Sequence, residues 1–99
     1  LYRMEQVPGE AAYDAAVAAV GAGELLVFKF ANAYCYSCRT MDRRIAKWAR
    51  GDGAGLPVRF VNVNLSEDAN EGLLARFGVE AVPFFQLYTA AGGLLEAFP

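Results

Sequence analysis

Runs of apolar residues along the chain predict its strands. Residues 24–30, with the sequence ELLVFKF, are almost continuously apolar, which is typical of a strand that is covered on both faces. Four further segments favour β structure, and they lie at 2–7, 58–64, 84–88 and 94–98. The last two flank a turn through 90–93 and therefore predict an antiparallel hairpin at the end of the chain.

Helical spacing of apolar residues predicts a helix after each of the first three strands. In residues 10–20 the apolar positions follow the helical repeat, at Tyr13, Ala16, Val17 and Val20. Residues 69–77 form the third predicted helix. A capping box of Asp68 and Glu71 is expected to open this helix, and Gly78 is expected to close it.

The second predicted helix runs over residues 35–50. Met41, Ile45 and Trp48 form an apolar stripe along it, so we expect all three in the core. The element order is then β-α-β-α-β-α-β-β. Alternation of this kind favours the α/β class, with a central mixed sheet and helices on both of its faces, in a single domain over residues 1–99.

Composition and charge exclude several classes of function. Apolar residues make up 56% of the 99 residues and charged residues 20%, which fits a folded chain rather than a disordered one. The net charge is −2 and there is no basic tract, so we expect no nucleic-acid partner. No stretch reaches the roughly 20 apolar residues that a membrane-spanning helix needs, so we expect no direct membrane insertion of this segment. Arginines cluster in the second helix, at Arg39, Arg43, Arg44 and Arg50, and indicate either a solvated face or a recognition surface.

Both cysteines of the chain lie in ANAYCYSCRTMDRR, at positions 35 and 38. Structural zinc and iron–sulfur sites need further Cys or His ligands, and the chain has no His and no third Cys. Covalent haem needs His directly after the second Cys, where this chain has Arg39. A disulfide that closes so short a loop is a poor structural staple. These exclusions favour a redox-active dithiol that requires no metal and no organic cofactor, its redox group being the Cys35–Cys38 disulfide.

The position of the pair gives the two thiols unequal roles. Cys35 falls where a strand leads into a helix N-terminus, whose unpaired N–H groups and dipole stabilise a thiolate. Cys38 lies one turn into the helix and is more sheltered. We therefore expect Cys35 to be the exposed nucleophile with a lowered pKa, and Cys38 to be the thiol that resolves the mixed disulfide.

A strand that leads into Cys-x-x-Cys and a helix resembles the thioredoxin superfamily, and the resemblance extends over nearly all of the chain up to residue 98. LLVFKFANAYCYSC is similar to the family's buried strand, aromatic residue and Cys pair, with Tyr34 where thioredoxins usually have Trp. ARFGVEAVPFFQLY is similar to the segment that carries the family's cis-proline. The resemblance implies that Pro83 is cis, that Val82 pairs its backbone with a substrate strand, and that the substrates are protein dithiols or disulfides.

A finer resemblance is to the C-terminal periplasmic domain of the transmembrane thiol:disulfide interchange reductase and related extracytoplasmic proteins. It is based on a long third-helix segment and on Asp42, a carboxylate four residues after the second Cys. It implies a periplasmic or other extracytoplasmic location, with a membrane thiol reductase as partner; a cytoplasmic location is the alternative. Thioredoxins end with a further helix, which is absent from the given chain after Phe98. We therefore expect either a longer chain or a sheet face that meets another domain or subunit.

Lys29 departs from the family pattern, because thioredoxins have a buried Asp at this position, six residues before the first Cys. Its side chain can extend to the sheet edge or pair with a carboxylate, as most lysines in apolar strands do. Alternatively, it lies under the cysteines and pairs with a thiolate or with Asp42, one turn beyond Cys38. A cation there would favour the thiolate and make the disulfide more oxidising. Lys29 and Asp42 are therefore candidate thiol-tuning residues.

Tyr34 and Tyr36 flank Cys35, where they either form an aromatic lip toward the substrate or cap exposed edges of the core. The sequence predicts a thiol:disulfide oxidoreductase whose direction is open, since the finer resemblance implies a reductase and Lys29 an oxidase or isomerase. Two alternatives also stay open. One is a non-catalytic interaction module with a passive disulfide, and the other is a metal carrier that uses the two thiolates.

Overall fold

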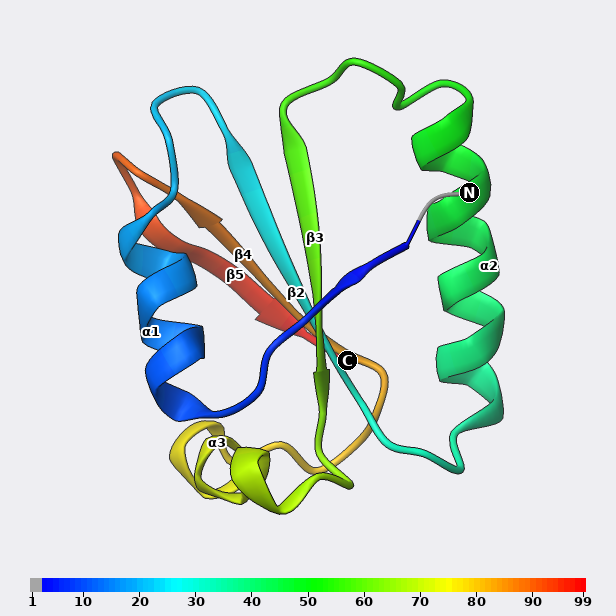
Figure 1. Ribbon diagram of the computed structural model, residues 1–99, viewed down its shortest axis with the longest axis vertical. Helices are drawn as coiled ribbons and strands as arrows, with labels where there is room; N and C mark the ends of the chain where they lie inside the picture. Colours follow the sequence, from blue (N-terminus) through cyan, green and yellow to red (C-terminus); the bar gives the residue numbers. More distant parts are fainter. Residues whose placement is uncertain (1–2) are drawn as a thin grey trace.

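The computed structural model describes residues 3–99, in which a central sheet has helices on both faces (Figure 1). The elements, in chain order, are β1 Glu5–Gln6, α1 Glu10–Ala18, β2 Leu25–Ala31, α2 Tyr36–Arg50, β3 Val58–Asn64, the 3-10 helix η1 Asp68–Asn70, α3 Glu71–Phe77, β4 Phe84–Thr89 and β5 Gly93–Phe98. The predicted α/β class and order of strands and helices are confirmed. Within residues 3–99, no helix combines the length and the apolar character that a bilayer crossing needs.

The five strands form one mixed sheet in the order β1-β3-β2-β4-β5. The central strand β2 pairs in parallel with β3 and antiparallel with β4. β4 and β5 form the predicted antiparallel hairpin. The first predicted strand, over 2–7, is confined to β1, which pairs in parallel with β3, and its Tyr2 lies outside the described residues. Because β2 is central, its carboxyl end delivers the chain to the middle of one edge of the molecule, where Cys35 follows.

One face of the sheet carries a large apolar core, and α1 and α3 cover it. Its buried members are Val7, Tyr13, Leu26, Phe28, Phe30, Val61, Val63, Leu73 and Tyr88. Tyr13 of α1 also satisfies its polar end there, because its hydroxyl donates to Gln86 Oε1 at 2.5 Å and lies 2.7 Å from the Tyr88 hydroxyl. Ala16, Val17 and Val20 pack against the same cluster, as their helical spacing predicts.

α2 covers the opposite face of the sheet. Ile45 is buried there and Met41 is partly buried, as the apolar stripe predicts. The prediction that Trp48 belongs to the core is wrong, because its side chain is 36% exposed. Its ring meets Phe60 of β3 edge-on at 5.8 Å, and a Cβ on Gly53 would lie 2.5 Å from it. Trp48 therefore lies at the margin of the contact between α2 and the sheet.

The start of α3 does not contain the predicted capping box. Asp68 lies in η1, and neither η1 nor α3 has a side-chain cap hydrogen bond. Instead, the buried Asn70 donates from Nδ2 to the carbonyls of Val7 and Asn64, at 3.0 Å each. The side chain of Asn70 therefore bonds the ends of two strands and does not cap α3. The 3-10 helix η1 leads into α3 in place of a capping box. The helix ends at Gly78 in the left-handed conformation, with φ 59°, as predicted.

Candidate active site

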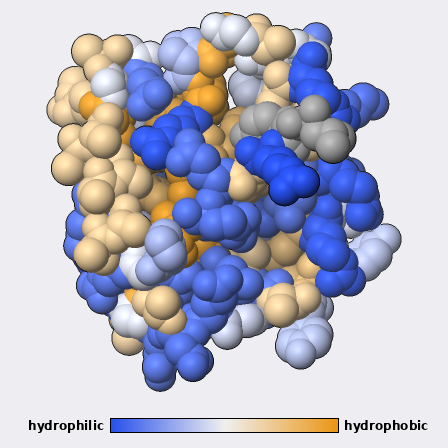
Figure 2. Space-filling model, in the orientation of Figure 1, coloured by the Kyte–Doolittle hydropathy of each residue, from blue (hydrophilic) through white to orange (hydrophobic). Residues whose placement is uncertain are grey.

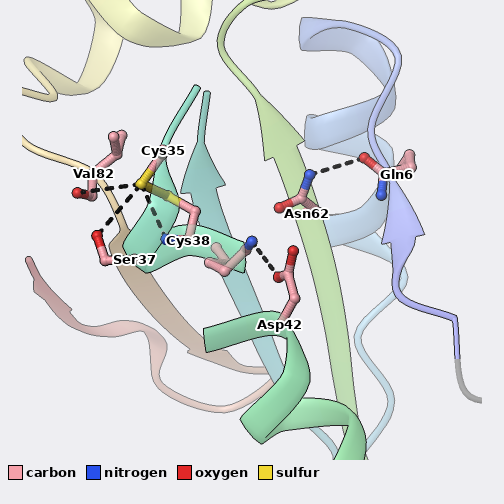
Figure 3. A network of polar contacts seen from close by, with 8 residues as sticks. Gln6, Cys35, Ser37, Cys38, Asp42, Asn62 and Val82 are labelled. Atoms are coloured by element: carbon pink, nitrogen blue, oxygen red, sulfur yellow. Dashed lines mark hydrogen bonds and ion pairs between the residues drawn. A yellow bond between two sulfur atoms is a disulfide. The ribbon is translucent and has the colours of Figure 1, made fainter. Parts of the chain in front are cut away.

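Cys35 and Cys38 form a disulfide at the start of α2, with their Cα atoms 5.2 Å apart (Figure 3). Cys35 is the N-cap residue of α2 and has an extended backbone, and its Sγ accepts a hydrogen bond of 3.0 Å from the Cys38 N–H. The two residues differ in access, because Cys38 is 2% exposed whereas Cys35 is partly exposed. A thiolate arriving from solution can therefore reach Cys35 far more easily than Cys38.

The loop before β4 approaches the accessible sulfur. The Val82–Pro83 peptide bond is cis, which confirms this part of the prediction. The Val82 carbonyl oxygen lies 3.9 Å from Cys35 Sγ, and Ser37 Oγ lies 3.5 Å from the same sulfur (Figure 3). The two segments meet because β2 leads to the cysteines while its antiparallel neighbour β4 starts from the proline loop.

Lys29 is buried in the middle of the sheet. It lies on the central strand, opposite Asn62 of β3 and Phe85 of β4, and is 1% exposed. Its Nζ forms an ion pair with Asp42 Oδ1 of α2. The carboxylate side of the pair is open to water, since the Asp42 side chain is 47% exposed. Of the arrangements that the sequence left open, the structure contains the pair with Asp42, on the helix that carries both cysteines.

A polar pair beside Lys29 was not predicted from the sequence. Asn62 neighbours Lys29 across β2 and β3, and its Nδ2 donates to Gln6 Oε1 at 2.9 Å (Figure 3). The buried Asn62 Oδ1 accepts no hydrogen bond within residues 3–99. Gln6 and Asp42 both line a hollow of about 470 Å³ between β1 and α2. The sequence did contain one signal for this polar pair, because two asparagines lie in the strand VRFVNVN.

Tyr34 and Tyr36 extend into solvent, with 92% and 70% of their surfaces exposed, so neither ring caps the core. The guanidinium of Arg39 lies 5.9 Å from the centre of the Tyr36 ring. A hollow of about 260 Å³ lies on the Val82 side of the site, and its lining combines Leu65, Leu74, Val79 and Val82 with the polar Asn32 and Glu80. Exposed aromatic rings and a partly apolar hollow thus lie beside the segments that carry the accessible sulfur, an arrangement that can receive a polypeptide segment.

Comparisons with known proteins identify relatives of the chain. The family model for thioredoxin matches residues 5–97. The chain is 32% identical over 74 residues to thioredoxin-like 2, chloroplastic, of Oryza sativa subsp. japonica. It is 34% identical over 79 residues to thioredoxin-like 2-2, chloroplastic, of Arabidopsis thaliana. These stretches cover 75% and 79% of this chain but 32% and 31% of the relatives, so the chain spans about a third of their length.

Solved thioredoxin structures have the same fold. Thioredoxin of Fasciola hepatica superposes with a TM-score of 0.77 at 24% identity, over 96% of this chain and 85% of that one. Thioredoxin f2 of Chlamydomonas reinhardtii superposes with a TM-score of 0.79 at 20% identity, over 97% of this chain and 82% of that one. The structures establish the fold, and the family model covers almost the whole sequence. The chain therefore belongs to the thioredoxin family.

Proposed function

We propose that this chain is a thiol:disulfide oxidoreductase that exchanges disulfides with protein substrates through Cys35 and Cys38. One observation carries the proposal: the disulfide at the N-terminus of α2 joins a partly exposed cysteine to a buried one. Membership of the thioredoxin family and the cis Val82–Pro83 bond beside Cys35 support it. The redox group is the disulfide itself, and the proposal requires no metal and no organic cofactor.

In the reducing direction, the Cys35 thiolate attacks one sulfur of a substrate disulfide. A mixed disulfide forms, and the other substrate sulfur leaves as a thiolate. The Cys38 thiolate then attacks Cys35 Sγ. The bond between Cys35 and the substrate breaks, and the substrate sulfur leaves as a thiolate with the electron pair of that bond. Two electrons have moved from the two cysteines to the substrate, which takes up two protons. The oxidising direction is the same sequence in reverse.

Two features of the site support a reactive Cys35. Its sulfur faces the N-terminus of a 15-residue helix, where the Cys38 N–H already points at it, so the negative charge of a thiolate is stabilised there. The second feature is the ion pair of Lys29 with Asp42 on the face of the sheet that α2 covers. We propose that these two residues tune the thiols through charge and contact no substrate.

The substrate-binding part of the proposal involves the surface around Cys35. An extended substrate segment that pairs with the backbone of Val82 would lie within reach of Cys35, because the Val82 carbonyl is 3.9 Å from the sulfur. Pro83 shapes this loop through its cis bond. Tyr34 and Tyr36 supply exposed rings next to the sulfur, and aromatic rings of this kind contribute contact area at small entropic cost.

The proposal also covers the direction of electron flow, the partner and the location of the protein. Asp42, four residues after Cys38, supports a likeness to the periplasmic domain of the transmembrane reductase. That likeness implies an extracytoplasmic location and electron exchange with a membrane thiol reductase. The buried ammonium of Lys29 supports a more oxidising couple. A redox titration against glutathione separates the two, because a reductase has the more negative potential.

Reduction of insulin by dithiothreitol tests the proposed activity. We expect the protein to accelerate it and the Cys35→Ser variant to be inactive. The Cys38→Ser variant is the matched control, since it retains the attacking thiol and lacks the resolving one. It should accumulate a mixed disulfide with insulin, visible by mass spectrometry and cleaved by excess dithiothreitol. An unaccelerated reaction with an unreactive Cys35 would instead favour the non-catalytic interaction module.

A further inference from the structure

Two neighbouring hollows lie one after the other along α2, from the cysteines toward the far end of the helix, and together they form the α2 groove. Its first part has a volume of about 250 Å³ and is lined by Tyr36, Ser37, Thr40, Met41 and Arg44. Its second part has a volume of about 390 Å³ and is lined by Arg44, Lys47, Trp48, Gly51 and Asp52. Arg44 belongs to both parts, so the two hollows meet at its side chain. The groove begins at Ser37, whose Oγ is 3.5 Å from Cys35 Sγ.

Two large rings line the α2 groove, and one of them is held in place. Tyr36 is 70% exposed and Trp48 36% exposed, although both have large apolar rings. Trp48 is fixed by its edge-on contact with Phe60 and by the close approach of Gly53. The partial exposure of Trp48 thus belongs to a formed surface, since the ring is packed on one side and lines the groove on the other.

The charge of α2 differs from the rest of the molecule. The helix carries five cations, Arg39, Arg43, Arg44, Lys47 and Arg50, and one carboxylate, Asp42, whereas the whole chain has a net charge of −2. Within residues 3–99, none of these five cations forms an ion pair. By contrast, Lys29, Arg59 and Arg76, which lie on other elements, are all ion-paired. Figure 2 shows hydrophilic residues over the right-hand side of the molecule, where Figure 1 places α2.

Helix stability explains only part of this charge. Lys47 and Arg50 lie in the last turn of α2, where cations interact favourably with the helix dipole. Arg39 lies in the first turn, where the same dipole disfavours a cation. Arg44 lies in the middle of the helix, where the dipole effect has faded. Arg39 contacts the Tyr36 ring and Arg43 donates to Thr40 Oγ1. Arg44 and Lys47, the two cations that line the groove, have no ion pair within residues 3–99, and one carboxylate, Asp52, lines it with them.

We propose that the α2 groove docks an acidic, partly apolar segment of the protein whose disulfide or dithiol reacts at Cys35. This inference rests on the proposed function and names the substrate class for it. The helix rises 1.5 Å per residue, so the groove is about 20 Å long and fits about six residues of extended chain. Apolar side chains of that segment contact Tyr36, Met41 and Trp48, while its carboxylates face Arg44 and Lys47. Attraction by the unpaired cations also speeds the encounter at low ionic strength.

Binding can be measured without any thiol chemistry, because Trp48 is the single tryptophan of the chain and lies in the groove. The probe is a cysteine-free peptide of alternating Glu and Leu, compared with the same peptide carrying Lys in place of Glu. We expect the acidic peptide to change Trp48 fluorescence and to bind at least about tenfold more tightly, with the difference shrinking in high salt. The Trp48→Phe variant should lose this signal, and any change that remains comes from the tyrosines.

Charge variants then locate the site. Arg44→Ala with Lys47→Ala removes two positive charges from the groove and should abolish the preference for the acidic peptide. Ala90→Glu with Ala91→Glu lowers the net charge by the same amount at the exposed β4–β5 turn, far from α2 in Figure 1, and should preserve it. Arg44→Lys retains the charge and should also preserve it.

Versions of the two peptides with an added disulfide test whether docking promotes exchange. We expect the reduced protein to react about tenfold faster with the acidic one at low salt. If the acidic peptide binds but no exchange occurs, the docking inference stands and the proposed oxidoreductase function is refuted. Equal binding of the two peptides, equal effects of the α2 and turn variants, or binding of single-stranded DNA in preference to the acidic peptide would each overturn the docking inference.

Discussion

The two faces of the sheet are built from the same strands and contain different chemistry. On β2, Leu26, Phe28 and Phe30 are fully buried in the apolar cluster under α1 and α3. The alternate position Lys29 faces α2, where it pairs with Asp42. Because successive side chains of a strand point to opposite faces, one strand supplies both environments. The apolar cluster lies on the first face, and the helix with the cysteines covers the second. We therefore expect that each face can be perturbed with limited effect on the other.

The largest expected effect comes from breaking the apolar face. Phe28 is fully buried, and its ring centre lies 4.3 Å from that of Tyr13. Phe28→Ala should lower the free energy of unfolding by about 3–5 kcal/mol, through lost burial and the cavity left behind. Urea unfolding measures it. Phe98→Ala, the same change at a side chain that is 39% exposed, should cost no more than about 1.5 kcal/mol. Equal losses at the two positions would contradict the comparison.

The α2 face should respond unequally to removal of each partner of its ion pair. Asp42→Asn leaves the fully buried Lys29 ammonium without a counter-charge and should cost about 2–3 kcal/mol of unfolding free energy. Lys29→Met leaves only a half-exposed carboxylate, which water can solvate, and should change stability by less than about 1 kcal/mol. Chemical denaturation of the two variants measures the difference, and a more damaging Lys29→Met would reverse the assignment of the buried partner.

Lys29→Met also tests whether the pair tunes the thiols. Removing the cation and leaving Asp42 unpaired both disfavour a nearby thiolate, so the pKa of the reduced Cys35 thiol should rise and the couple should become more reducing. Thiolate absorbance against pH and a glutathione titration report the two quantities. If both stay at the wild-type values, the pair has a structural role only.

A smaller effect is expected from the polar end of the apolar face. Tyr13→Phe removes the hydroxyl that donates to the buried Gln86 and should cost about 1–3 kcal/mol. Burial, and next the Tyr88 hydroxyl, raise the pKa of Tyr13 far above its ordinary value. Above about pH 10 the unfolded chain therefore ionises this tyrosine while the folded chain does not, and wild-type stability falls as pH rises. Urea unfolding at pH 8 and pH 11 should show a shallower fall for Tyr13→Phe.

The smallest effect is expected at the sheet edge, away from both faces. Arg59 donates two hydrogen bonds to the Glu5 carboxylate, at 2.8 and 2.7 Å, and thereby lowers the pKa of Glu5. A lowered pKa stabilises the fold at pH values above the ordinary pKa of a glutamate. This contribution is lost as the pH falls through the pKa of Glu5 in the folded chain. Because the pair is exposed, Glu5→Gln should cost at most about 1 kcal/mol at pH 7 and nothing at pH 2. A loss that is equally large at both pH values would point to packing instead.

The strands and helices were predictable because apolar periodicity records which side of each element is buried. The cis Val82–Pro83 bond followed from resemblance alone. Pairing of Lys29 with Asp42 was one of several arrangements open to the sequence, because a lysine side chain reaches many carboxylates. The sequence does not show which of several possible partners a polar side chain will bond. Asn70 is an example, because its amide donates to two distant carbonyls and α3 has no side-chain cap. Trp48 was misplaced because an apolar stripe does not say where the sheet beneath it ends.

Asn70 has a consequence for how this end of the molecule opens. Its single amide group holds the carbonyls at the ends of two neighbouring strands, at Val7 and Asn64. We expect a fluctuation that unwinds η1 to remove both hydrogen bonds in one event, so that this corner opens as a cooperative unit. The amide protons of Val7 and Leu65, which bond to Asn62 and Ala31, should then exchange with deuterium at similar rates. Since an asparagine amide carries no titratable proton, this coupling between strands holds at every pH at which the chain is folded.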